Sequence, residues 1–235
     1  MFKKLGFVTT LIIVFIGMSM LAVNIRPVRA EPRTWTVDDD GPADFHTIQE
    51  AVNAASLGDT VFVYNGTYHE DVLVNKTGIS VIGENTYTTT IDGNVSIGDM
   101  LHEASYVTLA SFSIDGRVYI GASSPGYGPH HDDIIRENVI KGGVLVAGWT
   151  KGSPYNISIN ENEIVKEGVG LVNCFGIVVS NNTIEDTDVA VTMGFLFGGE
   201  HRFHHNTFIN NTKVLENTEN QTAYWDDGYP SGGNY

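Results

Sequence analysis

The sequence is poor in cysteine and in basic residues. It contains one cysteine, Cys174, and 13 lysines and arginines against 28 aspartates and glutamates. A single cysteine excludes an intrachain disulfide, so packing and hydrogen bonding must stabilise the fold. The net charge of −15 disfavours partners that need a basic surface, such as nucleic acid and anionic membranes. It equally disfavours a polyanionic polysaccharide without bridging cations, so a cation or a neutral ligand fits better.

Long hydrophobic runs are absent except at the N-terminus. Two lysines precede an apolar run at 5–23, and Val28-Arg29-Ala30 ends the stretch with a small residue. This order predicts a signal peptide at 1–30 with cleavage after Ala30, and therefore a secreted or cell-surface protein that is not integral to the membrane. The alternative is an uncleaved anchor, because 19 residues just suffice to span a bilayer. Residues 1–30 hold four basic residues and no acid, which leaves nine basic against 28 acidic residues in 31–235.

Four segments in the second half of the chain share one short pattern. Each has alternating apolar residues, then Asn, one variable residue and an apolar residue, as in ISINENEI and IVVSNNTI. The aligned asparagines are Asn138, Asn162, Asn182 and Asn206, at steps of 24, 20 and 24 residues. Phe112 takes the same place 26 residues before Asn138. A repeat of this length in β-patterned pieces predicts a solenoid, because no single repeat can bury its own apolar face.

The aligned asparagines are expected to be structural. β-branched residues that alternate in runs of four to six favour strands whose inward side chains stack in rows. Asparagines at equivalent places would then lie one above another, each amide hydrogen-bonded to the next. The four asparagines are therefore predicted to form a ladder that binds no ligand.

Three stretches depart from the repeat. Residues 44–57 have the apolar spacing of a short amphipathic helix, which we expect to cap the open N-terminal end of the solenoid. Residues 121–133, GASSPGYGPHHDD, interrupt the period and form the longest loop, where a site would most naturally project. Residues 213–235 are polar and aromatic and are expected to form a C-terminal tail.

Two stretches resemble known β-helix proteins. Residues 45–74 resemble the opening of the pectin-methylesterase and pectate-lyase-like folds, with Gly66-Thr67-Tyr68-His69-Glu70 matching a Gly-x-Tyr-x-Glu motif found there. The closing WDDGYPSGGNY is similar to a tail that many secreted archaeal β-helix proteins carry. The repeats resemble the right-handed parallel β-helix superfamily of secreted prokaryotic proteins, which includes the NosD-like copper-maturation proteins. The resemblance implies an all-β fold, a single-stranded right-handed parallel β-helix over 31–235, and the repeat length predicts about eight or nine coils. It does not specify an activity.

Acidic residues after the loop are the catalytic candidates. A lyase needs a cation-neutralised carboxylate and a base, and a glycoside hydrolase needs two carboxylates. Asp132, Asp133, Arg136 and Glu137 form the best such cluster and could use calcium. Adjacent strand residues point to opposite faces, however, which weakens the pair of aspartates, and a solvated acidic turn is the alternative. Motifs that the pectin methylesterases carry, such as Gln-Asp-Thr-Leu, are missing.

Histidines are the candidates for a metal site. His201, His204 and His205 lie in one coil. Strand alternation would place the first and last of them about 13 Å apart, too far for one ion, unless the coil bends between them. Imidazole with carboxylate suits zinc or copper. A role in metal delivery is the third functional hypothesis, and structural or surface histidines are the alternative.

Aromatic residues in irregular segments could stack on sugar rings; they are Trp35, Trp149, Trp225, Tyr127, Tyr155, Tyr224 and Tyr229. The sequence therefore favours a non-catalytic protein that binds carbohydrate or a cell-surface protein. The alternative is a polysaccharide-active enzyme, either a calcium-dependent lyase or a protein similar to the glycoside hydrolases.

Overall fold

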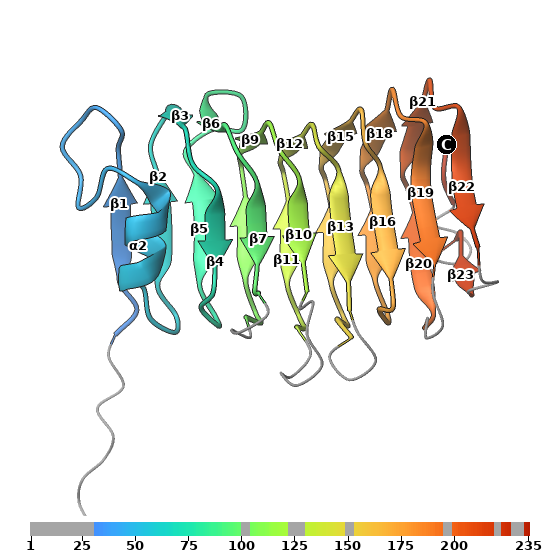
Figure 1. Cartoon of the computed structure of the whole chain (residues 1–235), viewed down its shortest axis with the longest axis horizontal. Coiled ribbons are helices and arrows are strands. Elements are labelled where there is room, and N and C mark those ends of the chain that lie inside the picture. The colour runs from blue at the N-terminus through green and yellow to red at the C-terminus, as the bar shows by residue number, and fades with distance from the viewer. Residues whose placement is uncertain are drawn as a thin grey trace, which may run out of the picture. The chain divides into compact units, whose positions relative to one another are not determined.

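The computed structural model describes residues 31–99, 104–121, 130–148, 153–194, 199–218, 222–226 and 233–235. The expected signal peptide and most of the expected loop at 121–133 lie outside these residues. Within them, the strands form three parallel sheets of nine, seven and seven strands, and successive strands along the chain belong to successive sheets (Figure 1). The fold is a parallel β-solenoid of the right-handed type with one short helix, all-β as predicted.

The bounds of the strands follow the order of the coils. Sheet 1 contains β1 (Thr34–Val37), β2 (Thr60–Val63), β5 (Ser80–Gly83), β8 (Thr108–Ala110), β11 (Ile134–Arg136), β14 (Ser158–Asn160), β17 (Val178–Ser180), β20 (His201–His204) and β23 (Ala223–Tyr224). Sheet 2 contains β3 (Gly66–Tyr68), β6 (Thr89–Ile91), β9 (Ser113–Ile114), β12 (Val139–Ile140), β15 (Glu163–Val165), β18 (Thr183–Glu185) and β21 (Thr207–Ile209). Sheet 3 contains β4 (Val72–Val74), β7 (Val95–Ile97), β10 (Val118–Ile120), β13 (Val144–Ala147), β16 (Val169–Val172), β19 (Val189–Gly194) and β22 (Lys213–Asn217).

The described strands make about seven coils that cross all three sheets, from β2–β3–β4 to β20–β21–β22. Strand β1 precedes the first coil and β23 follows the last. The repeat length had predicted eight or nine coils. The difference arises because residues 38–59 form an acidic loop and a helix instead of strands.

The core consists of rows of apolar side chains, one from each coil. The inward row of sheet 1 is fully buried and in register from coil to coil; its members are Val61, Val81, Leu109, Ile135, Ile159, Val179 and Phe203. Sheets 2 and 3 contribute similar rows of isoleucine and valine. Each coil thus buries its apolar residues against the coils before and after it, as the alternating pattern predicts.

Corners between the strands are made mostly by residues other than glycine in the left-handed conformation. After sheet 1 these residues form one row, with φ between 56° and 65°: Ser111, Glu137, Glu161, Asn181 and His205. Before sheet 1 they form a second row, which includes Tyr106, Asp132 and Asn156. A positive φ is costly for most side chains, so these corners need compensating interactions.

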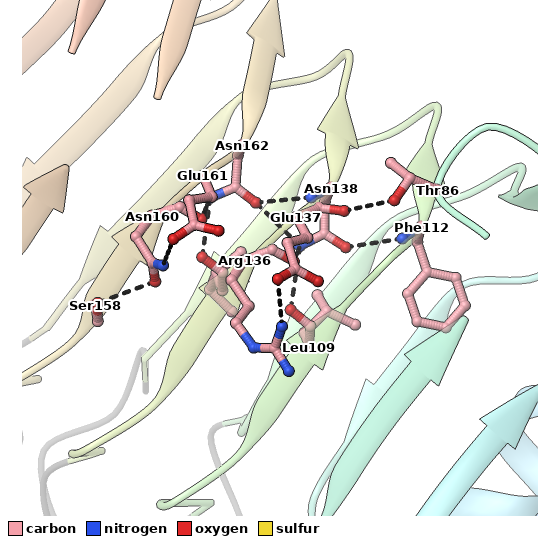
Figure 2. A network of polar contacts seen from close by, with 11 residues as sticks. Thr86, Leu109, Phe112, Arg136, Glu137, Asn138, Ser158, Asn160, Glu161 and Asn162 are labelled. Carbon is pink, nitrogen blue, oxygen red and sulfur yellow. Dashed lines mark hydrogen bonds and ion pairs between the residues drawn. The ribbon is translucent and has the colours of Figure 1, made fainter. Parts of the chain in front are cut away.

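In the row after sheet 1, four of the left-handed residues are followed by an asparagine that supplies that compensation. Oδ1 of Asn162 accepts hydrogen bonds from both the backbone N–H and Nδ2 of Asn138, each at 3.1 Å. Nδ2 of Asn162 donates to the carbonyls of Ile135 and Asn160 and to Oδ1 of Asn182. Figure 2 shows the start of this ladder, where Oδ1 of Asn138 accepts from the N–H of Phe112 at 3.0 Å. The pattern repeats to Asn206, so the asparagines occupy buried, fully hydrogen-bonded corners.

Helix α2 (Ile48–Ala54) lies against β1, β2 and β4 (Figure 1). It begins after Thr47, whose side chain accepts a hydrogen bond from the N–H of Glu50. Ile48, Ala51 and Val52 are buried in the core cluster. The helix is shorter than the stretch 44–57 because Asp44 hydrogen-bonds Thr36 instead of the helix.

Glu70 and Gln49 connect this helix to the first coil. The carboxylate of Glu70 accepts from the N–H groups of Ile48 at 2.7 Å and Gln49 at 3.0 Å. The side chain of Gln49 in turn accepts from the N–H of Leu73 and donates to its carbonyl. Tyr68 is buried and donates to the carbonyl of Tyr64. The Gly-x-Tyr-x-Glu motif therefore has a structural role in this chain.

Candidate functional site

The four candidate residues after the loop do not converge on one point. Asp132 has a left-handed φ of 58° and a carboxylate on the outside, where Oδ2 lies 2.7 Å from Nδ1 of His131. Asp133 points inward and is fully buried. The two aspartates thus lie on opposite sides of the solenoid wall, because the chain turns at the left-handed Asp132 just before β11 begins at Ile134. They cannot act together on one glycosidic bond.

Asp133 makes a structural contact at the corner before β11. Its Oδ1 accepts from the N–H of Val107 at 2.9 Å, as Asn138 does for Phe112 one corner later. Its Oδ2 has no hydrogen-bond partner among the described residues. Burial raises the pKa of Asp133 to about 7; the Val107 N–H opposes this shift, and the nearby charge of Asp132 adds to it. A carboxyl group in this place cannot reach a polysaccharide outside the wall.

Arg136 and Glu137 lie on the outer surface and pair with each other. Their Nη1 and Oε1 atoms are 2.7 Å apart (Figure 2). The carbonyl of Glu137 also accepts from the hydroxyl of Thr86 at 2.8 Å, which brings the 85–88 turn against this corner. Glu137 is thereby held beside a shallow hollow.

That hollow is a pocket of about 270 Å³ at the corner between sheets 1 and 2. Its lining residues are Thr86, Tyr87, Glu137, Asn138, Val139, Glu161 and Glu163. Three glutamates from two successive coils thus face one opening, beside a tyrosine that is 75% exposed. We call it the glutamate pocket. Its oxygens could hold a hard cation such as calcium.

A second surface follows the edge where the chain enters sheet 1. We call it the edge surface; its residues are Tyr106, His131, Asp132, Tyr155, Asn156, Phe175, Glu200, Arg202 and Tyr224. The His131 ring stacks on Tyr155 with centroids 4.8 Å apart and meets Tyr106 edge-on at 5.0 Å. Tyr155 and Phe175 are bridge partners in successive coils. Aromatic and polar side chains therefore continue along one edge over several coils.

The edge surface is hollowed beside Phe175. A pocket of about 400 Å³ lies there, lined by Asn156, Phe175, Gly176, Val178, Gly199, Glu200 and Arg202. Gly176 is the left-handed corner residue of its coil, at the position that Asp132 and Asn156 occupy in earlier coils. Because glycine has no side chain, it leaves open space at this position of the row. Gly199 lets the Phe175 ring lie on its backbone, because a Cβ there would come within 2.5 Å of the ring. The volume falls in the range of small-molecule sites.

Arg202 gives this pocket a positive group in an acidic protein. Arg33, Arg117 and Arg136 each pair with a carboxylate, whereas no ion pair of Arg202 is found within the described residues. Its guanidinium lies 6.0 Å from the ring centroid of Tyr224, and the Tyr224 hydroxyl donates to Glu200 at 3.2 Å. The pocket thus combines an exposed aromatic ring with hydrogen-bond donors and acceptors.

The three histidine candidates separate into one inner and two outer residues. His201 is fully buried, and its Nδ1 accepts from the N–H of Ile177 at 3.4 Å. His204 is the outward residue at the end of β20, and His205 is the left-handed corner residue that follows. Their Nδ1 atoms are 3.0 Å apart. The coil bend therefore brings His204 and His205 together and leaves His201 on the other side of the wall.

Several features of these surfaces were not inferred from the sequence. The Phe175 pocket depends on two glycines and an arginine in different coils, and Glu161 and Glu163 were not singled out. Aligning the repeats residue by residue, beyond the asparagines, would have placed Gly176 in the row of Asp132 and Asn156. Trp149, Tyr127 and Tyr229 lie outside the described residues, while Trp225 packs on Phe203 with centroids 4.7 Å apart.

Comparison with known proteins gives partial matches. No family model matches the chain. Pectinesterase 1 of Solanum lycopersicum is 36% identical over 81 residues, which are 32% of this chain and 15% of that protein. Among solved structures, the pectin methylesterase of Aspergillus niger in deglycosylated form is similar over 88% of this chain and 91% of its own, with 15% identity and a TM-score of 0.31. A structural likeness at this score carries no argument about function.

The described part of the chain contains no helix with the length and apolarity that a membrane crossing requires.

Proposed function

We propose that this protein binds carbohydrate along the edge surface, with the Phe175 pocket as the principal subsite. The observation that carries the proposal is the pocket itself, in which an aromatic ring that is 38% exposed lies beside an arginine without an ion pair in the described structure. A sugar ring needs an apolar surface for its C–H face and polar groups for its hydroxyls. Phe175 offers the first, and Asn156, Glu200 and Arg202 offer the second.

The charge of the chain restricts which carbohydrate can bind. At −15, the protein repels a densely charged polyanion over its whole surface. One arginine cannot reverse the negative potential of the whole surface, although its guanidinium can donate hydrogen bonds to sugar hydroxyls. We therefore infer a neutral or esterified polysaccharide as the ligand. The partial match to a pectinesterase is consistent with a carbohydrate partner.

The proposal also covers the location of the protein and the role of helix α2 as a cap on the solenoid. An extracellular or cell-surface location follows from the expected signal peptide at 1–30, and a polysaccharide or a surface protein would be met there. Helix α2 would cap the first coil, since it buries Ile48 and Val52 against β1, β2 and β4. Neither an extracellular location nor a capping helix requires the protein to be an enzyme.

Binding can be tested with a panel of neutral, methyl-esterified and acidic polysaccharides by affinity electrophoresis and calorimetry. We expect Phe175→Ala and Arg202→Gln to lower affinity for the bound polysaccharide by about 10-fold each, as loss of a central contact does. Tyr87→Ala is the matched control, because Tyr87 is an exposed aromatic residue that lines the glutamate pocket instead. Equal affinity in wild type and both edge variants would refute the proposal.

A second candidate function is polysaccharide cleavage at the glutamate pocket. Glu137, Glu161 and Glu163 line one opening, and two carboxylates are what a glycoside hydrolase needs. Of the four residues singled out from the sequence, Glu137 is part of this pocket and Asp133 is not. Incubation with the same panel, with and without calcium, should be followed by unsaturated products and reducing ends. Turnover that Glu137→Gln or Glu161→Gln abolishes would establish the enzyme, and binding without turnover would favour the first proposal.

A further inference from the structure

The N-terminal edge of each sheet is covered by a specific contact. In sheet 1, the Thr36 carbonyl of β1 accepts from the N–H of Phe45 at 3.1 Å. In sheet 2, a backbone N–H of β3 donates to Oδ2 of Asp39 at 3.2 Å. In sheet 3, the side chain of Gln49 pairs with both backbone groups of Leu73 in β4. Backbone groups that a further strand would use are therefore occupied in all three sheets at this end.

The C-terminal edges of the three sheets differ from one another. Sheet 1 ends in β23, whose length of two residues disfavours further pairing. In sheet 2, Tyr235 covers β21, because its carbonyl accepts from the N–H of Phe208 at 3.0 Å and its N–H donates to the Asn206 carbonyl at 2.8 Å. Sheet 3 ends in β22, and no described strand pairs with the far side of β22 (Figure 1). Within the described residues, β22 is thus the sheet end that lacks a cover.

The register shows which backbone groups of β22 face this open edge. In earlier coils, the first inward residue of each sheet 3 strand donates its N–H to a carbonyl of the following coil; these residues are Val72, Val95, Val118 and Val144. Leu215 takes the equivalent place, because it pairs with Val191, which pairs with Val169, which in turn pairs with Val144. The N–H and C=O groups of Leu215 therefore point away from β19 and toward the open edge.

The side chains of β22 permit pairing with a like strand. Val214 is 42% exposed, and Leu215 is partly buried against the core cluster. Nζ of Lys213 lies 3.5 Å from Oε1 of Glu216, so the strand is electrically neutral in a chain of net charge −15. Edge strands commonly prevent pairing with charges or with proline. β22 has neither a proline nor an uncompensated charge that would oppose it.

We propose that β22 pairs in antiparallel fashion with β22 of a second copy of this chain, about a two-fold axis at Leu215, to form an end-to-end dimer. Leu215 of each copy then exchanges two N–H···O hydrogen bonds with Leu215 of the other. On the outer face, each Val214 lies opposite Glu216 of the second copy, so no two like charges are directly opposed. The two partly buried leucines meet on the inner face and extend the apolar core across the contact.

The occupied N-terminal edges explain why the occupant is a second copy in this orientation. A head-to-tail contact would need a free strand edge at the N-terminal end, and the contacts described above occupy those edges. A contact between two C-terminal ends uses the same strand on both copies, so it closes at two and does not grow into a filament. The interface uses no residue of the edge surface or the glutamate pocket and does not depend on either proposed function.

Sedimentation velocity and light scattering of the purified protein over a wide range of concentration test the proposal. We expect an equilibrium between monomer and dimer without larger species. Val214→Glu should weaken the dimer by about 10-fold, because it creates two like-charge pairs across the interface. Val214→Lys should strengthen the dimer, because each lysine then faces Glu216 of the second copy.

Ile134→Glu and Ile134→Lys are the matched controls. Ile134 is 38% exposed on β11, in the middle of sheet 1, and these variants change the net charge of the chain by the same amounts. The difference in dimer affinity between the glutamate and lysine variants should therefore be much larger at Val214 than at Ile134. Circular dichroism and thermal unfolding show whether each variant keeps the fold.

Amide hydrogen exchange locates the contact. Exchange at the Leu215 N–H should slow as the protein concentration rises, whereas exchange at the Leu73 N–H should not change, because Gln49 already covers it. A monomer at every concentration would overturn the proposal. A dimer whose affinity responds equally to charge at Val214 and at Ile134 would also overturn it, because the two copies would then meet at another surface.

Discussion

Nδ2 of Asn206 donates to Oδ1 of Asn234 at 2.9 Å, and the N–H of Asn206 donates to the same oxygen at 3.1 Å. Asn234 thus repeats, 28 residues later, the contact that each ladder asparagine makes with the next. Its own Nδ2 donates to the carbonyl of Phe203 at 2.8 Å. Asn234 therefore supplies a fifth ladder position, and Tyr235 continues it by pairing with Phe208 and Asn206.

Removal of a ladder amide should destabilise the solenoid strongly. In Asn182→Ala, the N–H and Nδ2 of Asn162 lose their shared acceptor, and the carbonyls of Ile159 and Ser180 lose a donor. Each buried polar group left without a partner costs about 1–3 kcal/mol, so we expect a loss of about 3–5 kcal/mol in the free energy of unfolding. Urea unfolding measures it. The matched control is Asn160→Ala, whose side chain contacts Ser158 on the outer face and whose loss should change stability by less than about 0.5 kcal/mol.

Asp133 should make stability depend on pH. Its pKa is about 7 in the folded protein and 3.8 when unfolded, so the folded state holds the proton more tightly. Stability is therefore undiminished below about pH 4, falls as the pH rises from 4 to 7, and stays at its reduced value above 7. Asp133→Asn keeps the acceptor for the Val107 N–H without the charge.

The Asp133→Asn protein should be more stable than wild type by a few kcal/mol at pH 8, at most about 4, and similar at pH 4. Thermal unfolding across this pH range gives the comparison. Asp132→Asn, at the exposed neighbouring position, is the control and should keep most of the wild-type slope, because the charge of Asp132 is the smallest contribution to the raised pKa of Asp133. An unchanged slope in Asp133→Asn would show that another group causes the pH dependence.

The periodic half of the chain could be predicted because its residues repeat. Equivalent corners are marked by one asparagine in each repeat, at Asn138, Asn162, Asn182 and Asn206. Inward rows such as Leu109, Ile135 and Ile159 follow from the alternation of apolar and polar residues along each strand. Asn234 was missed because its step of 28 residues lies outside the observed period and its flanking residues lack the apolar alternation. The number of coils was overestimated because residues 38–59 carry a loop and helix in place of strands.

The candidate sites were harder to predict, because they depend on which face each side chain takes. Asp132 and Asp133 are adjacent in sequence, but a left-handed φ at the first and burial of the second place them on opposite sides of the wall. The Phe175 pocket combines residues from three coils and owes its space to glycines. Neither effect leaves a short motif in the sequence.

Glu70 should stabilise the helix at the N-terminal end. Its carboxylate binds the N–H groups of Ile48 and Gln49, where the helix dipole favours negative charge. We expect Glu70→Ala to lower the free energy of unfolding by about 2 kcal/mol, with Glu70→Gln intermediate. Amide hydrogen exchange should become faster at these two N–H groups. Glu50→Gln, exposed on the same helix, controls for the loss of charge; an equal effect there would exclude a specific contact.

Gly199 should be needed for the shape of the Phe175 pocket. A Cβ at this position would lie 2.5 Å from Cδ1 of Phe175, so Gly199→Ala must displace the ring. If the pocket binds carbohydrate, affinity should fall about as much as in Phe175→Ala. Gly170→Ala is the control, because that glycine lies on sheet 3, where a Cβ would meet Leu145 at 2.9 Å. Calorimetry with the bound polysaccharide distinguishes the two variants.

Cys174 should be chemically inert while the protein is folded. Its side chain is fully buried, and burial raises the pKa of the thiol to about 12, so the reactive thiolate is scarce at neutral pH. We expect no reaction with Ellman's reagent at pH 8 under native conditions and one thiol per chain in concentrated guanidinium. Rapid labelling of the native protein would mean that this coil opens to solvent. Since the Gly199 N–H donates to the Cys174 carbonyl at 3.2 Å, such opening would also disturb the backbone beneath the Phe175 pocket.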